Sequence, residues 1–220
     1  MARIAEDLVL LLLDNASAQP ALDRARRERV ISAAVLLDLA HACRIRPAVD
    51  SEPVEAGRLV VLSGPDPADP VMEPALNLLL RHPLSPAVAI AKLRRTTAAT
   101  VLWQLERSGY IQQVRLQTGG VRHPRAWPLI DRTRVRQIRA ALMSTLVDQH
   151  KPDPAIASII TLLYTVDGLG AVLSLHDRGW EWVLRRAGDI ASGSWVSESE
   201  PELAEVNLAV TTAAIRQALK

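Results

Sequence analysis

Apolar residues recur along most of the chain with the three-to-four-residue spacing of amphipathic helices. Asp23 stands where it can cap the second of these helices, and Ser85 followed by Pro86 is a typical helix start. The pattern predicts helices over residues 3–13, 24–43, 72–81, 85–94, 97–108, 133–147, 153–165, 169–176, 178–190 and 202–218.

Two pairs of short extended runs predict β-hairpins. Residues 44–49 and 58–62 form the first pair. The second pair, Tyr110–Leu116 and Val121–Leu129, flanks a Thr-Gly-Gly turn and is the clearest hairpin signal in the chain. The chain has no Phe, so Leu, Val, Ile and Ala must fill its core, which favours helices over sheets. With no repeat and no Gly- or Ser-rich linker, a mainly α chain with a single domain over residues 1–220 is expected.

Nothing in the chain predicts a membrane span or an oxidising compartment. The apolar run Leu8–Leu13 holds six residues between acidic ones, far too few to cross a bilayer. The single cysteine, Cys43, cannot form an internal disulfide. A cytoplasmic location follows as the expectation.

Charge is segregated along the sequence. Residues 81–140 hold 12 of the 26 Lys and Arg residues but only two acids, Glu106 and Asp131, so this segment is +10 and the remainder of the chain −8. A GC-rich genome can explain why 23 of the 26 basic residues are Arg, but not why acids avoid the middle of the chain. The segregation favours a face that meets phosphates, on a membrane, a nucleic acid or a small anion.

Catalytic and metal-binding signatures are not found. The sequence has no phosphate-binding loop, no Gly-x-Ser-x-Gly and no dinucleotide fingerprint. The five histidines stand singly, none spaced for metal with another His or Cys, and no cofactor is predicted. Asp38 lies in an apolar helix, where we expect a structural carboxylate bonded to an arginine or a helix terminus.

Four tryptophans invite different interpretations. Trp103, Trp180 and Trp182 are expected to pack in the core. Trp127 lies on the second arm of the basic hairpin, among Arg122, Arg125 and Arg132. An amphipathic ring beside guanidinium groups suits a membrane interface, and packing under the hairpin is an equal alternative.

One interpretation of the basic middle is a winged helix-turn-helix. Residues 85–93 would support a recognition helix at 97–107, with residues 110–129 as the wing. The recognition helix would offer few side chains able to read base edges. DNA binding is therefore the second hypothesis.

The chain also resembles a known family almost from end to end. The segments that carry the resemblance are Ala2–Asp14, Leu36–Ala40 with the Arg-flanked strand after it, Leu105–Ile111, the hairpin that closes on Trp127–Leu129, and the helical C-terminal half. Together they are similar to the Golgi phosphoprotein family, in its bacterial branch. The resemblance implies a single helical domain with a central helical bundle wrapped by amphipathic helices, a protruding β-hairpin and a small second hairpin.

The resemblance also implies a function. Eukaryotic members bind phosphatidylinositol 4-phosphate and recruit the tails of membrane proteins. This chain would then be a peripheral adaptor with no catalysis, bound to anionic, phosphoinositide-type lipids on the inner face of the membrane. Cytoplasmic tails of membrane proteins and homo-oligomerisation through the hairpin are expected partners, whereas nucleic acid is not. A scaffold that has lost the lipid pocket is a third hypothesis.

The family's lipid pocket is carried over incompletely. One of its arginines falls at Arg95, while the other three pocket positions fall at Asp23, Ser32 and Ala98, so the headgroup is not specified. Neighbouring arginines offer replacements. We expect the anion-binding residues to be Arg24, Arg27, Arg29, Arg94 and Arg95, and the membrane-facing hairpin residues to be Arg115, Arg122, Arg125 and Trp127.

Overall fold

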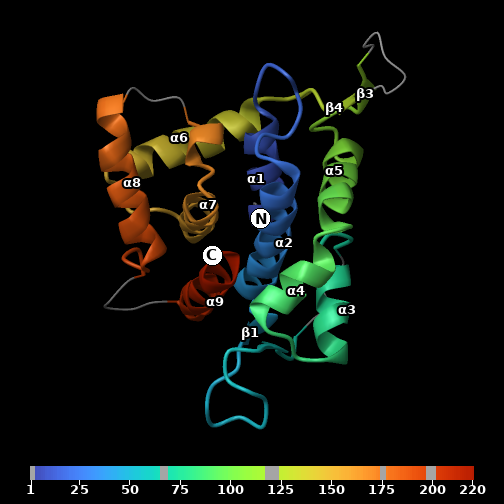
Figure 1. The fold of residues 1–220 in the computed structure, drawn as a ribbon, viewed down its shortest axis with the longest axis vertical. Coiled ribbons are helices and arrows are strands. Elements are labelled where there is room, and N and C mark those ends of the chain that lie inside the picture. The colour runs from blue at the N-terminus through green and yellow to red at the C-terminus, as the bar shows by residue number, and fades with distance from the viewer. Residues whose placement is uncertain (1–2, 65–68, 117–123, 174–176, 197–201) are drawn as a thin grey trace.

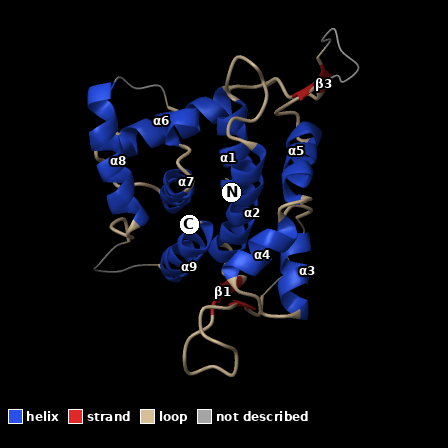
Figure 2. Ribbon diagram, viewed as in Figure 1, coloured by secondary structure: helices blue, strands red, loops and turns tan. Residues whose placement is uncertain are grey.

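The computed structural model describes residues 3–64, 69–116, 124–173, 177–196 and 202–220. Helices dominate these segments, and two short hairpins interrupt them (Figure 2). In chain order the elements are α1 (Ile4–Leu13), α2 (Arg24–His41), β1 (Ile45–Pro47), β2 (Leu59–Val61), α3 (Glu73–Arg81), α4 (Pro86–Leu93), α5 (Thr97–Arg107), β3 (Val114–Arg115), β4 (Arg125–Ala126), α6 (Thr133–Leu146), α7 (Pro154–Thr165), a 3₁₀ turn (Leu169–Ala171), α8 (Asp177–Ala191) and α9 (Leu203–Leu219).

The central bundle forms around the most apolar helices. Every residue of α1 is buried, as are residues 30–40 of α2 and 155–163 of α7. Helix α2 packs against α1, α4, α5, α7 and α9, so these five helices surround it (Figure 1). A helical segment that is mostly apolar on all its faces must lie inside the protein, and this explains why these buried segments occupy the middle.

Asp38 joins two of the central helices. Its carboxylate lies on α2 and accepts the main-chain N–H groups of Ile4 (2.7 Å) and Ala5 (3.1 Å), at the start of α1. Those N–H groups have no partner within their own helix, so a buried helix start needs an acceptor from outside. The expectation of a structural carboxylate at a helix terminus is confirmed.

Both predicted hairpins are present as antiparallel pairs. In the first, Ile45 lies opposite Val61, and a further bridge joins Leu59 to Leu84 ahead of α4. In the second, Val114 lies opposite Ala126 and Arg115 opposite Arg125. The second hairpin protrudes beyond α5 in Figure 1. Its connecting residues 117–123 lie outside the described residues.

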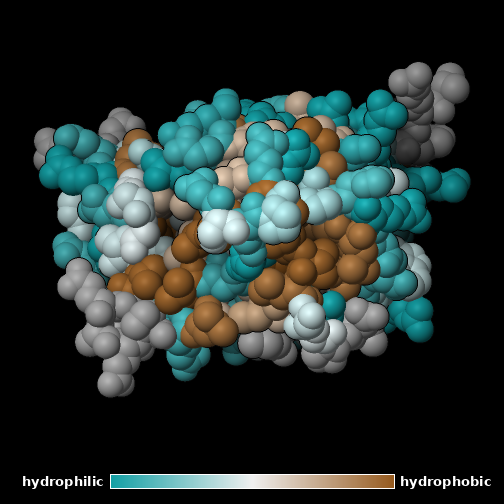
Figure 3. Space-filling view, turned by 90° about the horizontal axis from the view of Figure 1, so that it is seen from below, coloured by the Kyte–Doolittle hydropathy of each residue, from teal (hydrophilic) through white to brown (hydrophobic). Residues whose placement is uncertain are grey.

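Most of the basic segment, residues 81–140, lies along one side of the molecule. Helices α4 and α5 and the β3–β4 hairpin lie there beside α3, whereas α6, which ends the segment, runs across to α8 on the opposite side (Figure 1). The underside of that view carries apolar regions (Figure 3). Large exposed apolar residues on α3, α4 and α9 are Leu80, Val88, Leu203 and Val210.

The helix boundaries confirm most of the sequence predictions. Asp23 caps α2 by accepting the Arg26 N–H, and α4 begins at Pro86 as expected. The predicted helix over 169–176 is wrong in its described part, residues 169–173, where a three-residue 3₁₀ turn forms; residues 174–176 lie outside the described residues. Gly168 and Gly170 weaken helix formation there, and Val172 already ends the turn.

Candidate functional site

The centre of the candidate site is the junction between α4 and α5. Arg94 follows the last residue of α4, and Arg95 stands one residue further on. Both side chains are exposed. Within the described residues, neither makes an ion pair or a side-chain hydrogen bond. The two guanidinium groups are therefore available to an external anion.

The β3–β4 hairpin extends this basic surface. Arg115 and Arg125 are exposed and directly opposite each other across the two strands. Side chains at directly opposed positions of an antiparallel pair lie on the same face, where like charges are destabilising. Neither residue has an acidic partner among the described residues. Arg122, the third predicted hairpin arginine, lies outside the described residues.

Trp127 lies below the hairpin. The side chain is half-buried and packs against the core, and its main-chain N–H donates to the Ala18 carbonyl at 2.6 Å. Trp127 therefore packs under the hairpin, which is one of the two alternatives that the sequence leaves open. Contact of its ring with a membrane stays a prediction.

The α2 arginines have partners within the chain. Arg24 pairs with Glu28 at 2.6 Å. Arg27 donates to the carbonyls of Pro20 and Leu22 at 3.3 and 3.4 Å. Arg29 donates to the carbonyls of Ala218 and Leu219, at the end of α9. Their hydrogen bonds thus lead away from Arg94 and Arg95, although α2 itself packs against α4 and α5.

The three remaining positions of the family pocket do not supply cationic groups. Ser32 is fully buried and donates to the Glu28 carbonyl at 2.9 Å, so it is not a surface position. Asp23 serves as the α2 cap, and Ala98 is half-buried on α5. Of the predicted anion-binding residues, Arg94 and Arg95 are the two that combine exposure with the absence of a partner in the described chain.

A second group of charges connects α1 with α6. Arg134 donates to Asp7 at 2.7 Å and to Glu6 at 3.0 Å, and its guanidinium lies 5.0 Å from the centre of the Tyr110 ring. Arg3 pairs with Glu6 at 2.8 Å and with Asp69 at 2.6 Å. Burial raises the pKa of Asp7, while the Arg134 guanidinium acts in the opposite direction. These arginines neutralise carboxylates that are almost completely buried.

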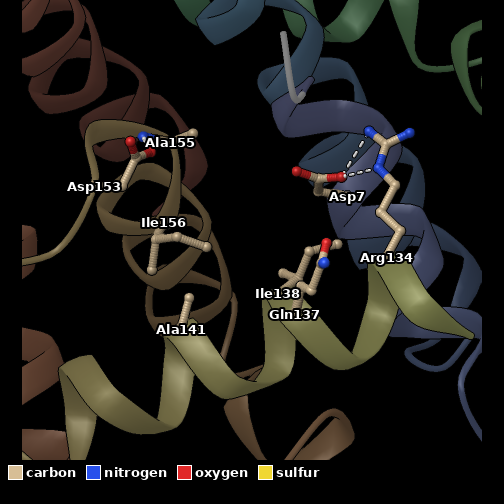
Figure 4. A pocket seen from close by; sticks show the side chains of 8 residues that line it. All are labelled: Asp7, Arg134, Gln137, Ile138, Ala141, Asp153, Ala155 and Ile156. Atoms are coloured by element: carbon tan, nitrogen blue, oxygen red, sulfur yellow. Dashed lines mark hydrogen bonds and ion pairs between the residues drawn. The ribbon is translucent and has the colours of Figure 1, made fainter.

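A pocket of about 260 Å³ opens beside this network (Figure 4). Asp7 and Arg134 stand on one side of it, and Asp153, Ala155 and Ile156 on the other. Asp153 already caps α7 by accepting the Ala155 N–H at 2.8 Å. The carboxylates here therefore have structural partners.

Among the described residues, no three His, Cys, Asp or Glu side chains gather as a metal site would require. No described helix is both long and apolar enough to cross a bilayer.

The family comparison fits this arrangement of helices and hairpins. Residues 4–210, nearly the whole chain, match the model of the Golgi phosphoprotein 3 (GPP34) family. The chain belongs to the Golgi phosphoprotein family. A comparison with curated proteins gave no match.

For this Golgi phosphoprotein family member, one surface feature was missed by sequence reasoning. Trp103 was expected in the core, but its side chain is 48% exposed, and the Arg107 guanidinium lies 5.3 Å from the ring centre. The four-residue spacing of Thr97, Val101 and Leu105 is the sequence feature that could have predicted the exposure of Trp103. These residues form the buried face of α5, and Trp103, two positions from Val101 and Leu105, must then point the other way.

Proposed function

We propose that this protein is a peripheral membrane adaptor that binds anionic, phosphoinositide-type lipid headgroups through the α4–α5 junction and the β3–β4 hairpin. Arg94, Arg95, Arg115 and Arg125 are the proposed contacts among the described residues. The proposal includes no catalytic step. Membership of the Golgi phosphoprotein family and the exposure of these four arginines support it.

The observation that carries the proposal is the pairing of Arg115 with Arg125. Two like charges opposite each other cost stability in the isolated protein, and no acid in the described chain offsets them. A phosphate group between them would turn repulsion into two charge-assisted hydrogen bonds, since guanidinium forks match phosphate oxygens. The pairing is therefore better suited to a bound anion than to the free protein.

The surface charge also suits a membrane more generally. Exposed cations without an acidic partner in the described chain line this side: Arg81, Lys92, Arg94, Arg95, Arg115, Arg125 and Arg132. Each basic residue near an anionic bilayer contributes about 1 kcal/mol. Several together support reversible attachment even where no single deep pocket exists.

The adaptor role has further parts that belong to the proposal. We place the protein in the cytoplasm, on the inner face of the membrane, with cytoplasmic tails of membrane proteins as clients. The protruding hairpin offers main-chain groups for self-association, because its strands form a sheet of only two.

DNA binding is the second candidate, favoured by the order α4, α5 and then a β-hairpin. This order is that of a winged helix-turn-helix. Against it, Ala99 and Trp103 occupy the middle of the outward face of α5 and cannot form the bidentate contacts that identify bases, which leaves Arg107 at the end of the helix as the arginine on this face.

The test is cosedimentation with vesicles of graded anionic content, with and without phosphoinositide, beside a gel shift with duplex DNA at the same salt concentration. Pelleting that rises with anionic content supports the adaptor. DNA retention without pelleting would move the winged-helix hypothesis to first place. If the protein neither pellets with vesicles nor retains DNA, a protein scaffold that does not bind lipid becomes the favoured hypothesis.

A further inference from the structure

Helix α5 presents one exposed stripe to solvent. Residues at every fourth position, Arg95 just before the helix and then Ala99, Trp103 and Arg107, are all exposed. At 1.5 Å per residue, the helical part of the stripe is about 12 Å long from Ala99 to Arg107, and Arg95 lies in the turn that precedes the helix. Trp103 thus lies one helical turn before Arg107 and follows an exposed arginine at the start of α5.

The orientation of this stripe is fixed by the opposite face of α5. Thr97, Val101 and Leu105 are buried against the core, and Val101 and Leu105 are completely inaccessible. The helix cannot rotate Trp103 inwards without exposing these side chains. The exposed indole is therefore a stable feature of the folded protein.

Arg107 holds the indole from one side. Its guanidinium lies 5.3 Å from the centre of the Trp103 ring, a cation–π distance. The one acid on α5, Glu106, accepts the main-chain N–H of Gln113 at 2.8 Å. The Glu106 carboxylate is therefore engaged at the start of the hairpin, and the charged group in contact with the indole is the Arg107 guanidinium.

We infer that Trp103 is an interfacial anchor, whose indole enters the boundary between headgroups and acyl chains while Arg95 and Arg107 contact lipid phosphates. This inference rests on the proposed lipid-binding function and names the side chain that supplies apolar contact. Tryptophan is enriched at membrane interfaces because its ring is apolar and its N–H is polar. The long arginine side chains can reach the headgroups beside it.

Charge complementarity selects an anionic bilayer as the occupant of this face. The stripe continues into the exposed cations of the α4–α5 junction, and these have no acidic partner among the described residues. Trp127 is less suited to this role, because its ring packs partly against the core. The anchor is thus assigned to α5 and not to the base of the hairpin.

The test uses the full chain and vesicles made of equal parts phosphatidylcholine and phosphatidylglycerol. Trp103→Ala is expected to weaken vesicle binding about tenfold, or about 1.4 kcal/mol, because the apolar contact of the indole with the bilayer is lost. Val210→Ala is the control, because Val210 is 53% exposed on α9 and lies beside the end of α8, with Ile190 and Trp195, and not on α5. This control should bind as the wild type does.

A second measurement detects the indole directly. Vesicles with brominated acyl chains should quench part of the tryptophan emission of the wild type, and Trp103→Phe should bind but lose most of that quenching. Unchanged binding by Trp103→Ala, or unchanged quenching in Trp103→Phe, would overturn the inference and leave the proposed function standing. A wild type that binds no anionic vesicle would overturn both. If Trp103→Ala weakened the retention of duplex DNA and left vesicle binding unchanged, the inference of a membrane anchor would also be overturned.

Discussion

Arginines at the start of α6 and in the β3–β4 hairpin stand close together in sequence but in opposite environments. Arg134 is surrounded by the carboxylates of Glu6 and Asp7 and by the Tyr110 ring. Arg115 faces another arginine, Arg125, and solvent. The same residue type therefore stabilises the fold in one place and lacks a partner in the other. The difference teaches that the location of the acids, not that of the basic residues, separates the structural arginines from those proposed to bind lipid.

The largest effect should come from breaking the paired region. Arg134→Ala leaves Glu6 and Asp7 without their shared cation, and both are more than nine-tenths buried. We expect a loss of about 3 kcal/mol in the free energy of unfolding, because an uncompensated buried charge is costly. Urea denaturation followed by circular dichroism measures it. If the chain is the single domain that its sequence predicts, unfolding will be one cooperative transition.

Arg136→Ala is the matched control for this change. Arg136 lies on the same helix but is exposed, so its removal should alter stability by less than about 0.5 kcal/mol. Equal effects of the two substitutions would contradict the division into paired and unpaired arginines.

A second prediction concerns the dependence of stability on pH. Burial raises the pKa of Asp38 from 3.8 to about 7, against the opposing hydrogen bonds from Ala5 and Ile4. Between these values the folded protein binds a proton that the unfolded chain does not, so this group's contribution to stability should fall as the pH rises from about 4 to about 7.

Asp38→Asn removes the titrating group and keeps an oxygen acceptor for the start of α1. Thermal denaturation at several pH values should show the variant gaining stability relative to the wild type as pH rises through that interval. A constant difference across this range would show that Asp38 does not titrate as inferred.

The smallest expected effect on stability concerns the unpaired arginines of the β3–β4 hairpin. Arg125→Glu places an acid directly opposite Arg115 and should stabilise the hairpin by about 0.5 kcal/mol, as opposed charges do across strands. The same change should weaken binding to anionic vesicles, because it removes the Arg125 cation and gives Arg115 an acidic partner within the protein. Stability and binding are thus expected to change in opposite directions. A loss of both would indicate that Arg125 supports the fold.

The sequence predicts the helices well because their boundaries depend on local signals. Asp23 and Pro86 start α2 and α4 where expected, and the apolar residues around Asp38 explain its structural role. The pairing of Arg134 with Asp7 joins residues 127 positions apart, and no local pattern reports such a contact. The prediction of Arg27 and Arg29 as anion-binding residues rests on their spacing, which gives no information on the carbonyl groups that accept their hydrogen bonds in the fold.

The central claim is that the position of the unpaired arginines, and not net charge, directs the protein to anionic membranes. The most direct test compares two double variants of equal charge in a vesicle-binding titration. Arg94→Gln with Arg95→Gln removes unpaired cations, whereas Arg58→Gln with Arg185→Gln removes cations that pair with Glu55 and Glu181. At about 1 kcal/mol per basic residue, the first variant should lose at least about tenfold in affinity and the second very little. Equal losses in both variants would contradict the claim.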